Sequence, residues 1–419
     1  MPLTRRLPQP AELRSLLQFQ RITLNRRAAR LGRAADVHDL RRIAQRRTPQ
    51  PAFDYVDGAA VDELTARRTR KALQGCQLLP RMLSGVDEVD TSVEIAGGRS
   101  ALPFGIAPTG FTRFMHAEGE DAGAAAATAH GIPFSLSTMG TRSVEEVADT
   151  SGAGRRWFQL YLWRDRAASE DLLQRAWENG FDTLLVTVDT PVAGQRLRDA
   201  RNGMTIPPRL SAKTLLDASY RPEWWFNFLT TDPLTFASLS DTAQDLPSLI
   251  NAMFDPTLNL EDLQWIRSVW PGQLFVKGVL TVEDARRSLQ SGADGLVISS
   301  HGGRQLDRAP VPLHALAQIR STLGPEVPLI YDSGLMSGND IITALALGAD
   351  FTMVGRAYLY GLMAGGREGV ERVIELLAQE IRVSMMLMGA ASVADLTTDS
   401  IHTPWESEQA DLQETAQEL

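Results

Sequence analysis

The stretch GLVISSHGGRQLD, residues 295–307, places a histidine and an arginine just after a buried strand. His301 belongs to the residue type best suited to take a proton near neutral pH, and Arg304 carries a planar fork of donors that fits a carboxylate. The glycines between them permit a tight turn, so that both side chains would reach one small molecule. A surface turn with two polar residues is the alternative. Polar side chains at other predicted strand ends favour an active site.

Two further residues strengthen this interpretation. Asp189 follows another apolar run, and a carboxylate there would orient the ring of His301 and stabilise its charged form. Arg196 comes shortly afterwards, and two arginines that reach one cavity are unfavourable unless they meet an anion. Glycines at predicted helix starts expose backbone N–H groups that suit a phosphate: Gly334, Gly338 and Gly355. The pattern predicts a pocket for a small carboxylic acid and a phosphorylated cofactor.

Eight short apolar segments must position these side chains, and we predict that they are strands. Most are separated by amphipathic stretches of helical period, several of which end at a glycine suited to a helix C-terminus. Continuous apolar strands that alternate with helices are typical of a parallel sheet buried on both faces. Eight such units predict an α/β fold, a closed (β/α)8 TIM barrel with its site at the C-terminal strand ends. The strands are predicted to begin at Pro103, Pro133, Trp157, Thr183, Leu274, Gly295, Pro328 and Phe351.

The length of 419 residues is compatible with one barrel domain that carries additional segments. We expect a single domain whose parts are an N-terminal helical cap, the barrel, C-terminal helices and an acidic tail, at residues 1–100, 101–365, 366–396 and 404–419 respectively. The long interval after the fourth strand would emerge at the barrel mouth and is a candidate lid. Its aromatic cluster, residues 224–228, is expected to pack on the barrel; contact with a membrane interface is the alternative.

The composition excludes several classes of function. The net charge of −9 argues against general affinity for nucleic acid, and no apolar run is long enough for a transmembrane helix. The single cysteine, Cys76, excludes a disulfide within the chain and a cysteine cluster for a metal, and we expect no metal site. The arginine-rich first fifty residues lack the apolar core of a signal peptide, so we expect a cytoplasmic protein. Peripheral contact with the inner face of the membrane stays open.

The chain resembles the FMN-dependent L-2-hydroxy acid dehydrogenases and oxidases. The likeness runs from about Asp39 to about Leu396, through motifs that occur in the family's order: FDYVDGAA, GIAPTGFTRFMHAEGE, SLSTMGTRSVEEVA, WFQLYLWRDR, LLVTVDTPVAGQRLRDARNGM, FVKGVLTVEDA, SSHGGRQLD and ALALGADFTMVGRAYLYGL. The nearest group is the flavin-linked L-lactate dehydrogenases of actinobacterial type. The resemblance implies FMN as cofactor, a small 2-hydroxy acid as substrate and a homo-oligomer, a tetramer in the family.

The resemblance also implies a role for each residue at the strand ends. His301 corresponds to the active-site base and Asp189 to its carboxylate partner. The residues that would bind the substrate are Tyr55, Met139, Tyr161, Arg196 and Arg304. The residues that would bind FMN are Pro108, Thr109, Gly110, Ser137, Gln159, Thr187, Lys277, Ser299, Asp332, Gly334, Gly355 and Arg356. Of these, Lys277 would place a fixed cation beside the flavin, where it favours the reduced ring.

Two positions depart from the family pattern. Ser300 stands where an asparagine is usual before the histidine, and a hydroxyl cannot reproduce the two-sided bonding of an amide. Met336 stands where the family has an arginine that helps to hold the FMN phosphate. The interpretation is that phosphate binding is weaker or differently arranged, and that the cofactor is retained.

The predicted reaction is the FMN-dependent oxidation of L-lactate to pyruvate. Met139 stands where lactate-using members have an aliphatic residue, which favours a short aliphatic hydroxy acid. Gly110 and the aromatic cluster favour an electron acceptor other than oxygen, such as a membrane quinone. Two alternatives are an oxidase of the same family that releases hydrogen peroxide, and a catalytically silent barrel with impaired FMN binding.

Overall fold

The computed structural model describes residues 25–202, 212–232 and 255–405, together with isolated residues outside these ranges. The expected acidic tail lies outside the described residues from 406 onward, as do residues 203–211 and most of 233–254 of the candidate lid. Within the described part of the chain, no helix is long and apolar enough to cross a membrane.

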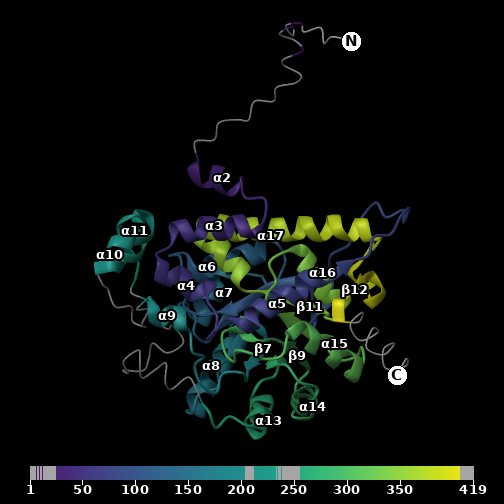
Figure 1. The fold of residues 1–419 in the computed structure, drawn as a ribbon. Helices are drawn as coiled ribbons and strands as arrows, with labels where there is room; N and C mark the ends of the chain where they lie inside the picture. Colours follow the sequence, from purple (N-terminus) through teal and green to yellow (C-terminus); the bar gives the residue numbers. More distant parts are fainter. Residues whose placement is uncertain are drawn as a thin grey trace, which may run out of the picture.

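Eight parallel strands close into a barrel, which confirms the predicted (β/α)8 fold (Figure 1). Neighbouring strands follow the order of the sequence, and the last pairs with the first through Val354 and Ile106. Each begins within about two residues of its predicted start. The strands are β4 (Phe104–Thr109), β5 (Phe134–Ser137), β6 (Arg156–Leu160), β7 (Phe181–Thr187), β8 (Gln273–Val279), β9 (Gly295–Ile298), β10 (Leu329–Asp332) and β11 (Phe351–Val354).

Helices surround the barrel, and several begin at a side-chain cap that the sequence supplies. Ser143 accepts from the N–H of Glu146, whose carboxylate accepts from the N–H of Ser143, and Ser337 accepts from the N–H of Asp340. These helices are α6 (Gly119–Ala129), α7 (Val144–Ser151), α8 (Arg166–Glu178), α13 (Leu260–Val269), α14 (Val282–Gln290), α15 (Pro312–Leu323), α16 (Gly338–Ala346) and α17 (Arg356–Met388).

Helix α17 changes direction at Gly365 and Gly366, whose backbone angles are not helical. The two halves approach so closely that a Cβ at Gly361 would lie 2.4 Å from the carbonyl oxygen of Gly369. Only glycine permits this contact. The second half then packs against the N-terminal helices, as Figure 1 shows for α3 (Val37–Arg47).

The N-terminal segment folds over the barrel and also contributes a short hairpin that the sequence analysis did not predict. Its helices are α2 (Arg26–Leu31), α3, α4 (Gln50–Asp57) and α5 (Leu64–Gly75). Strand β1 (Gln77–Leu78) pairs with β12 (Ile401–His402), and β2 (Val93–Ile95) pairs with β3 (Gly98–Ser100). We keep the division of the chain into a cap, a barrel, C-terminal helices and a tail as a proposal.

The β2–β3 hairpin closes the N-terminal end of the barrel. Ile95 packs with large buried side chains inside the barrel, among them Trp157, Phe275 and Phe351. The guanidinium of Arg155 donates to the carbonyls of Ile95, Ala96 and Gly98, with distances of 2.8–2.9 Å. The barrel is therefore a packed core at this end, and any site must lie at the opposite end.

Candidate active site

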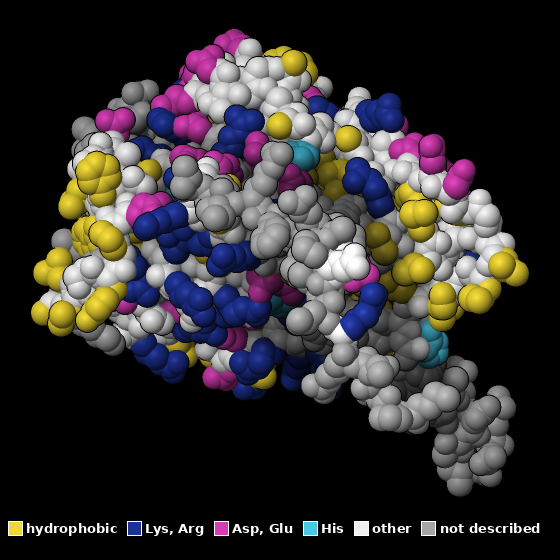
Figure 2. All heavy atoms as spheres, turned by 90° about the horizontal axis from the view of Figure 1, so that it is seen from above, with side chains coloured by type: hydrophobic (Ala, Val, Ile, Leu, Met, Phe, Trp, Pro, Cys, Tyr) yellow, Lys and Arg dark blue, Asp and Glu magenta, His cyan; other side chains and the backbone are white. Residues whose placement is uncertain are grey.

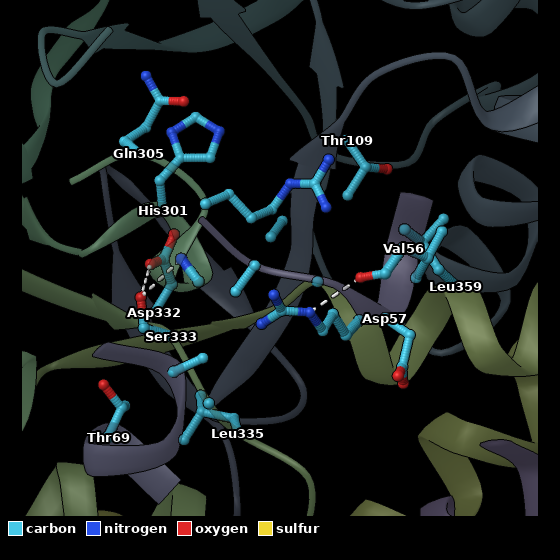
Figure 3. A pocket seen from close by; sticks show the side chains of 18 of the residues that line it. Val56, Asp57, Thr69, Thr109, His301, Gln305, Asp332, Ser333, Leu335 and Leu359 are labelled. Carbon is cyan, nitrogen blue, oxygen red and sulfur yellow. Dashed lines mark hydrogen bonds between the residues drawn. The ribbon is translucent and has the colours of Figure 1, made fainter. Parts of the chain in front are cut away.

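A cavity of about 640 Å³ opens at the C-terminal ends of the strands (Figure 3). The predicted site residues that line it are Tyr55, Pro108, Thr109, Gly110, Ser137, Met139, Tyr161, Arg196, Lys277, His301, Arg304, Asp332, Gly334, Gly355 and Arg356. Five predicted residues lie outside its lining: Gln159, Thr187, Asp189, Ser299 and Gly338, whose N–H donates to Glu380. Three of these five bond to a lining residue, since Gln159 accepts from Ser137, Asp189 bonds to His301, and Ser299 bonds to Lys277.

His301 lies between a carboxylate and a phenol. Its Nδ1 is 3.1 Å from Oδ1 of Asp189, and its Nε2 is 3.4 Å from the hydroxyl of Tyr161. Burial alone would raise the pKa of Asp189, but the charges of His301 and Lys277 and the hydrogen bond from His301 lower it. A carboxylate that stays ionised holds the ring and stabilises the imidazolium, so Nε2 is the atom placed to accept a proton.

The backbone that carries His301 is held by two serine hydroxyls. His301 has a left-handed φ of 55°, which is uncommon for a side chain of this size. The Oγ of Ser299 accepts from the N–H of His301 at 2.9 Å. The Oγ of Ser333 accepts from the N–H groups of Ser300 and Gly302 at 3.1 and 3.2 Å. The sequence did not predict this role of Ser333, because the hydrogen bonds join two loops that are distant in sequence.

Helix α4 carries Tyr55 over the barrel mouth, and two arginines flank the ring of this tyrosine. The guanidinium carbons of Arg196 and Arg304 lie 5.1 and 4.8 Å from the ring centroid. Arg304 also donates to the carbonyl oxygens of Tyr55 and Gly58. Burial, followed by the charge of Arg196, lowers the pKa of Arg304 to about 10. A bound carboxylate would offset both effects, so this end of the cavity suits a small acid anion.

The cavity floor has polar atoms that suit a flavin. Lys277 Nζ lies 2.7 Å from Oδ2 of Asp332 and 2.9 Å from Oγ of Ser299. Among the described residues, Gln159 Nε2 and Thr187 Oγ1 are buried without a hydrogen-bond partner. Buried donors without partners are costly, and a flavin ring carries the carbonyl oxygens and ring nitrogens that would satisfy them. These residues therefore fit the group that the sequence implies.

The other end of the cavity contains the expected phosphate site. Arg356 does not point freely into it: its Nε donates to the carbonyl of Val56 at 3.0 Å, marked by the dashed line in Figure 3, and its Nη2 to that of Gly58 at 2.8 Å. Met336 lines this end and supplies no charge. Gly334 has a φ of 81°, which a side chain would strain.

Helix α5 contributes residues to the same end that sequence reasoning missed. Arg67, Arg70 and Lys71 line the cavity beside Gly334 and Met336. A signal for them was present in the sequence, because cations at these spacings share one face of a helix. Nothing local in the sequence indicates which face of this helix meets the barrel.

Comparison with known proteins agrees with this geometry. The chain matches the FMN-dependent dehydrogenase family over residues 44–403. A protein of Mycobacterium tuberculosis (strain ATCC 25618 / H37Rv), whose description as an L-lactate dehydrogenase is provisional, is 52% identical over 397 residues, which are 95% of this chain and 96% of that protein. The L-lactate dehydrogenase of Xanthobacter autotrophicus (strain ATCC BAA-1158 / Py2) is 40% identical over 87% of this chain and 95% of its own length.

A solved structure with the same architecture is that of the monotopic membrane protein (S)-mandelate dehydrogenase. It is 37% identical to this chain, covers 88% of it and 100% of its own chain, and superposes with a TM-score of 0.85. The chain belongs to the family of FMN-dependent dehydrogenases.

Proposed function

We propose that the protein oxidises L-lactate to pyruvate with FMN as cofactor and passes the electrons to an acceptor other than oxygen. The observation that carries the proposal is the placement of His301, with its ionised partner Asp189, beside the two arginines at one wall of the cavity. The names of the lactate dehydrogenases similar to this chain support the choice of substrate.

The residues divide the work of the reaction between them. Oxidation of the hydroxyl-bearing carbon releases two electrons and two protons, and bound FMN supplies the electron acceptor. Arg196 and Arg304 hold the carboxylate and fix which face of the substrate meets the cofactor. Nε2 of His301 accepts a proton, Asp189 stabilises the resulting charge, and Tyr161 donates to an oxygen of the substrate.

The cofactor would lie across the cavity from the floor to the phosphate end. Ser137, Gln159 and Lys277 are the residues proposed to hold the ring. Gly334, Gly355 and the start of α17 are proposed to hold the ribityl chain and phosphate, through backbone N–H groups at a helix terminus. Pro108, Thr109, Thr187, Ser299 and Asp332 complete the proposed set.

The side chain at position 139 supports a short aliphatic substrate. Met139 lines the cavity next to Gly110, where a Cβ would lie 2.7 Å from the Cβ of Met139. An aliphatic residue in this close contact suits the methyl group of lactate. A Met139→Ala variant enlarges this space, and we expect it to use (S)-mandelate better and L-lactate less well than the wild type.

An anaerobic flavin-reduction experiment tests the function. The holoprotein is mixed with L-lactate, D-lactate, glycolate or (S)-mandelate, and bleaching of the flavin absorbance is followed before an acceptor is added. We expect L-lactate to bleach the flavin fastest. Reoxidation by a soluble quinone that exceeds reoxidation by oxygen would support a dehydrogenase; rapid release of hydrogen peroxide in air would instead make the protein an oxidase. Absence of bleaching by every hydroxy acid would refute the proposal.

We also propose peripheral membrane contact through α10 (Ala212–Ser219) and α11 (Pro222–Thr230). Trp224 and Phe228 of α11 pack against Phe114, as the sequence analysis expected for this cluster. Other side chains of these helices and of the turn between them face solvent: Leu215, Leu216, Tyr220, Phe226 and Leu229. Figure 2 shows hydrophobic side chains gathered at the left edge of the molecule, where α10 and α11 lie in Figure 1. The monotopic membrane relative supports this assignment.

Vesicle co-sedimentation tests the membrane contact. The wild type is expected to sediment with vesicles of anionic lipid, and a Phe226→Asp/Leu229→Asp variant to remain in the supernatant with unchanged flavin reduction. Equal sedimentation of both proteins would contradict the contact. A homo-oligomer, expected to be a tetramer, and a cytoplasmic location stay predictions; light scattering of the purified protein tests the former.

A further inference from the structure

Helix α5 turns a cationic face toward the cavity. Seven residues at and within this helix line the cavity, and all except Thr69 follow a spacing of three and four positions: Glu63, Ala66, Arg67, Thr69, Arg70, Lys71 and Gln74. Residues at this spacing lie on one face of a helix. Three of them carry a positive charge: Arg70 is partly buried, and Arg67 and Lys71 are exposed at the cavity edge. The neighbouring Arg68 is also exposed but does not line the cavity.

This face lies against the phosphate end of the cavity. A Cβ at Gly334 would lie 2.9 Å from Cγ2 of Thr69 and 3.7 Å from Cδ of Arg70. Nη1 of Arg70 donates to the carbonyl oxygen of Gly334 at 2.6 Å and to the carboxylate of Asp340. In Figure 3, Thr69 and Leu335 lie on the same side of the pocket, below Ser333. The helix is therefore fixed next to the loop that follows β10.

Among the described residues, the barrel supplies one cation at the same end of the cavity, Arg356, whereas a phosphate group carries up to two negative charges. Met336 is uncharged, and Arg356 uses two of its nitrogens on the carbonyl oxygens of Val56 and Gly58. Phosphate groups in proteins are held by charge-assisted hydrogen bonds from arginine or lysine together with backbone N–H groups. The remaining cations must come from elsewhere in the cavity wall.

Helix α5 has side-chain nitrogen donors at this position that have no acceptor among the described residues. Within the described part of the chain, Nε and Nη2 of Arg70 have no hydrogen-bond partner, although its Nη1 is engaged. Arg67 and Lys71 form no ion pair with any described residue. Arg70 is paired with Asp340, whereas Arg67 and Lys71 line the cavity without a carboxylate partner among the residues described and can donate to an anion bound there.

We propose that Arg67, Arg70 and Lys71 bind the phosphate of FMN and supply the charge that Met336 does not. The inference rests on the proposed function, because it takes FMN as the ligand of this cavity. It assigns a cofactor-binding role to the N-terminal cap, so that FMN joins α5 to the barrel. Binding of the cofactor would then also fix α4 and Tyr55 over the substrate, because α4 immediately precedes α5.

Comparison of FMN with riboflavin isolates the contribution of the phosphate. Apoprotein is titrated with each flavin, and quenching of flavin fluorescence gives the dissociation constants. For an Arg67→Gln/Lys71→Gln variant, we expect FMN affinity to fall about 10- to 100-fold, while riboflavin affinity stays unchanged. This variant keeps the contacts of Arg70 with Gly334 and Asp340. Adding Arg70→Gln is expected to weaken FMN binding further.

Two controls separate this role from a structural one. Arg68→Gln removes a cation from the same helix outside the cavity and is expected to leave both affinities unchanged. Adding Met336→Arg to the double variant is expected to restore FMN affinity, because it returns a cation to the same end. Unchanged FMN affinity in the double and triple variants, or an equal loss for FMN and riboflavin, would overturn the inference alone. A wild-type protein that binds neither flavin would overturn the proposed function as well.

Discussion

The two ends of the cavity are built differently. At the reacting end, His301 has a hydrogen-bonded partner on each ring nitrogen, and Arg196 and Arg304 enclose Tyr55. At the phosphate end, the position expected to be an arginine is Met336, and the arginine that remains donates to the backbone of α4. The reacting end has the charged side chains that the sequence predicted for it. The phosphate end has the predicted glycines, but its positive charge comes in part from another element.

This difference follows from what each end must do. Proton transfer and carboxylate binding depend on distances within a few tenths of an ångström, so few residue types can serve at the reacting end. A phosphate is bound through charge and hydrogen bonds that can come from several directions, so its cations can move from the barrel loop to a neighbouring helix. Changes at the reacting end are therefore expected to affect turnover most, and changes at the phosphate end to affect cofactor affinity.

Replacing His301 has the largest expected effect. A His301→Gln variant keeps a side chain of similar size but cannot accept the proton, so the rate of flavin reduction by L-lactate is expected to fall on the order of 10²- to 10⁴-fold. Stopped-flow absorbance measures this rate, and the flavin content of the purified variant is the control. Loss of FMN together with activity would mean that the loop of His301 also holds the cofactor.

Asp189→Asn tests the charge behind the histidine. Loss of a hydrogen bond to a charged group is expected to lower kcat about 10- to 100-fold. Steady-state kinetics at saturating FMN measure kcat, and the flavin content of the purified variant is the control. An unchanged kcat in Asp189→Asn would contradict the assigned partnership.

The lowered pKa of Asp189 also predicts how stability depends on pH. A carboxyl whose pKa is lower in the folded protein than in the unfolded chain stabilises the fold above the unfolded value, about 3.9. This contribution is lost as the pH falls through the lower folded value. The free energy of unfolding of the wild type is therefore expected to decrease in this acidic range more than that of Asp189→Asn, as denaturant titrations would show.

Met336→Arg in the wild type addresses the phosphate end. An additional cation at this end is expected to raise FMN affinity by about tenfold, without a change in riboflavin affinity or in kcat. Fluorescence titration and steady-state kinetics measure the two quantities. A change in kcat with saturating FMN would show that the two ends are coupled and would weaken the contrast between them.

Ser300→Ala has the smallest expected effect. The Oγ of Ser300 lies 3.2 Å from that of Ser333, whereas the backbone N–H of residue 300, which also bonds to Ser333, is kept in the variant. Loss of one neutral hydrogen bond is expected to lower the free energy of unfolding by about 1 kcal/mol, with flavin reduction changed by less than about threefold. A larger kinetic effect would give position 300 a direct role at the reacting end.

The barrel and most of its strand-end residues could be predicted because their signals are local. An apolar run followed by polar residues and glycine identifies a strand end, and parallel strands of a barrel bring those ends together. The eight strands and the cavity position of His301, Arg304 and Lys277 follow from this rule.

The remaining features depend on contacts between distant segments. Nothing near Arg356 in the sequence shows that α4 ends close enough to receive its donors, or that α5 presents Arg70 rather than Arg68 to the cavity. The β2–β3 hairpin is too short to show a strand pattern in the sequence. The hydrogen bonds of Ser333 to the loop of His301 join two loops that are distant in sequence and neighbours in space. Such contacts are set by packing of whole elements, which a single sequence does not display.

The hairpin at the N-terminal end of the barrel bears on the order of chemical events. With Ile95 and its neighbours filling that end, the described residues leave the cavity open at the C-terminal strand ends, where we expect the hydroxy acid, the keto acid and the electron acceptor all to enter and leave. The proposed reaction then predicts that pyruvate leaves before a bulky quinone reaches the flavin, so the two half-reactions are expected to alternate. Double-reciprocal plots at several acceptor concentrations would then give parallel lines, and pyruvate would compete with the acceptor.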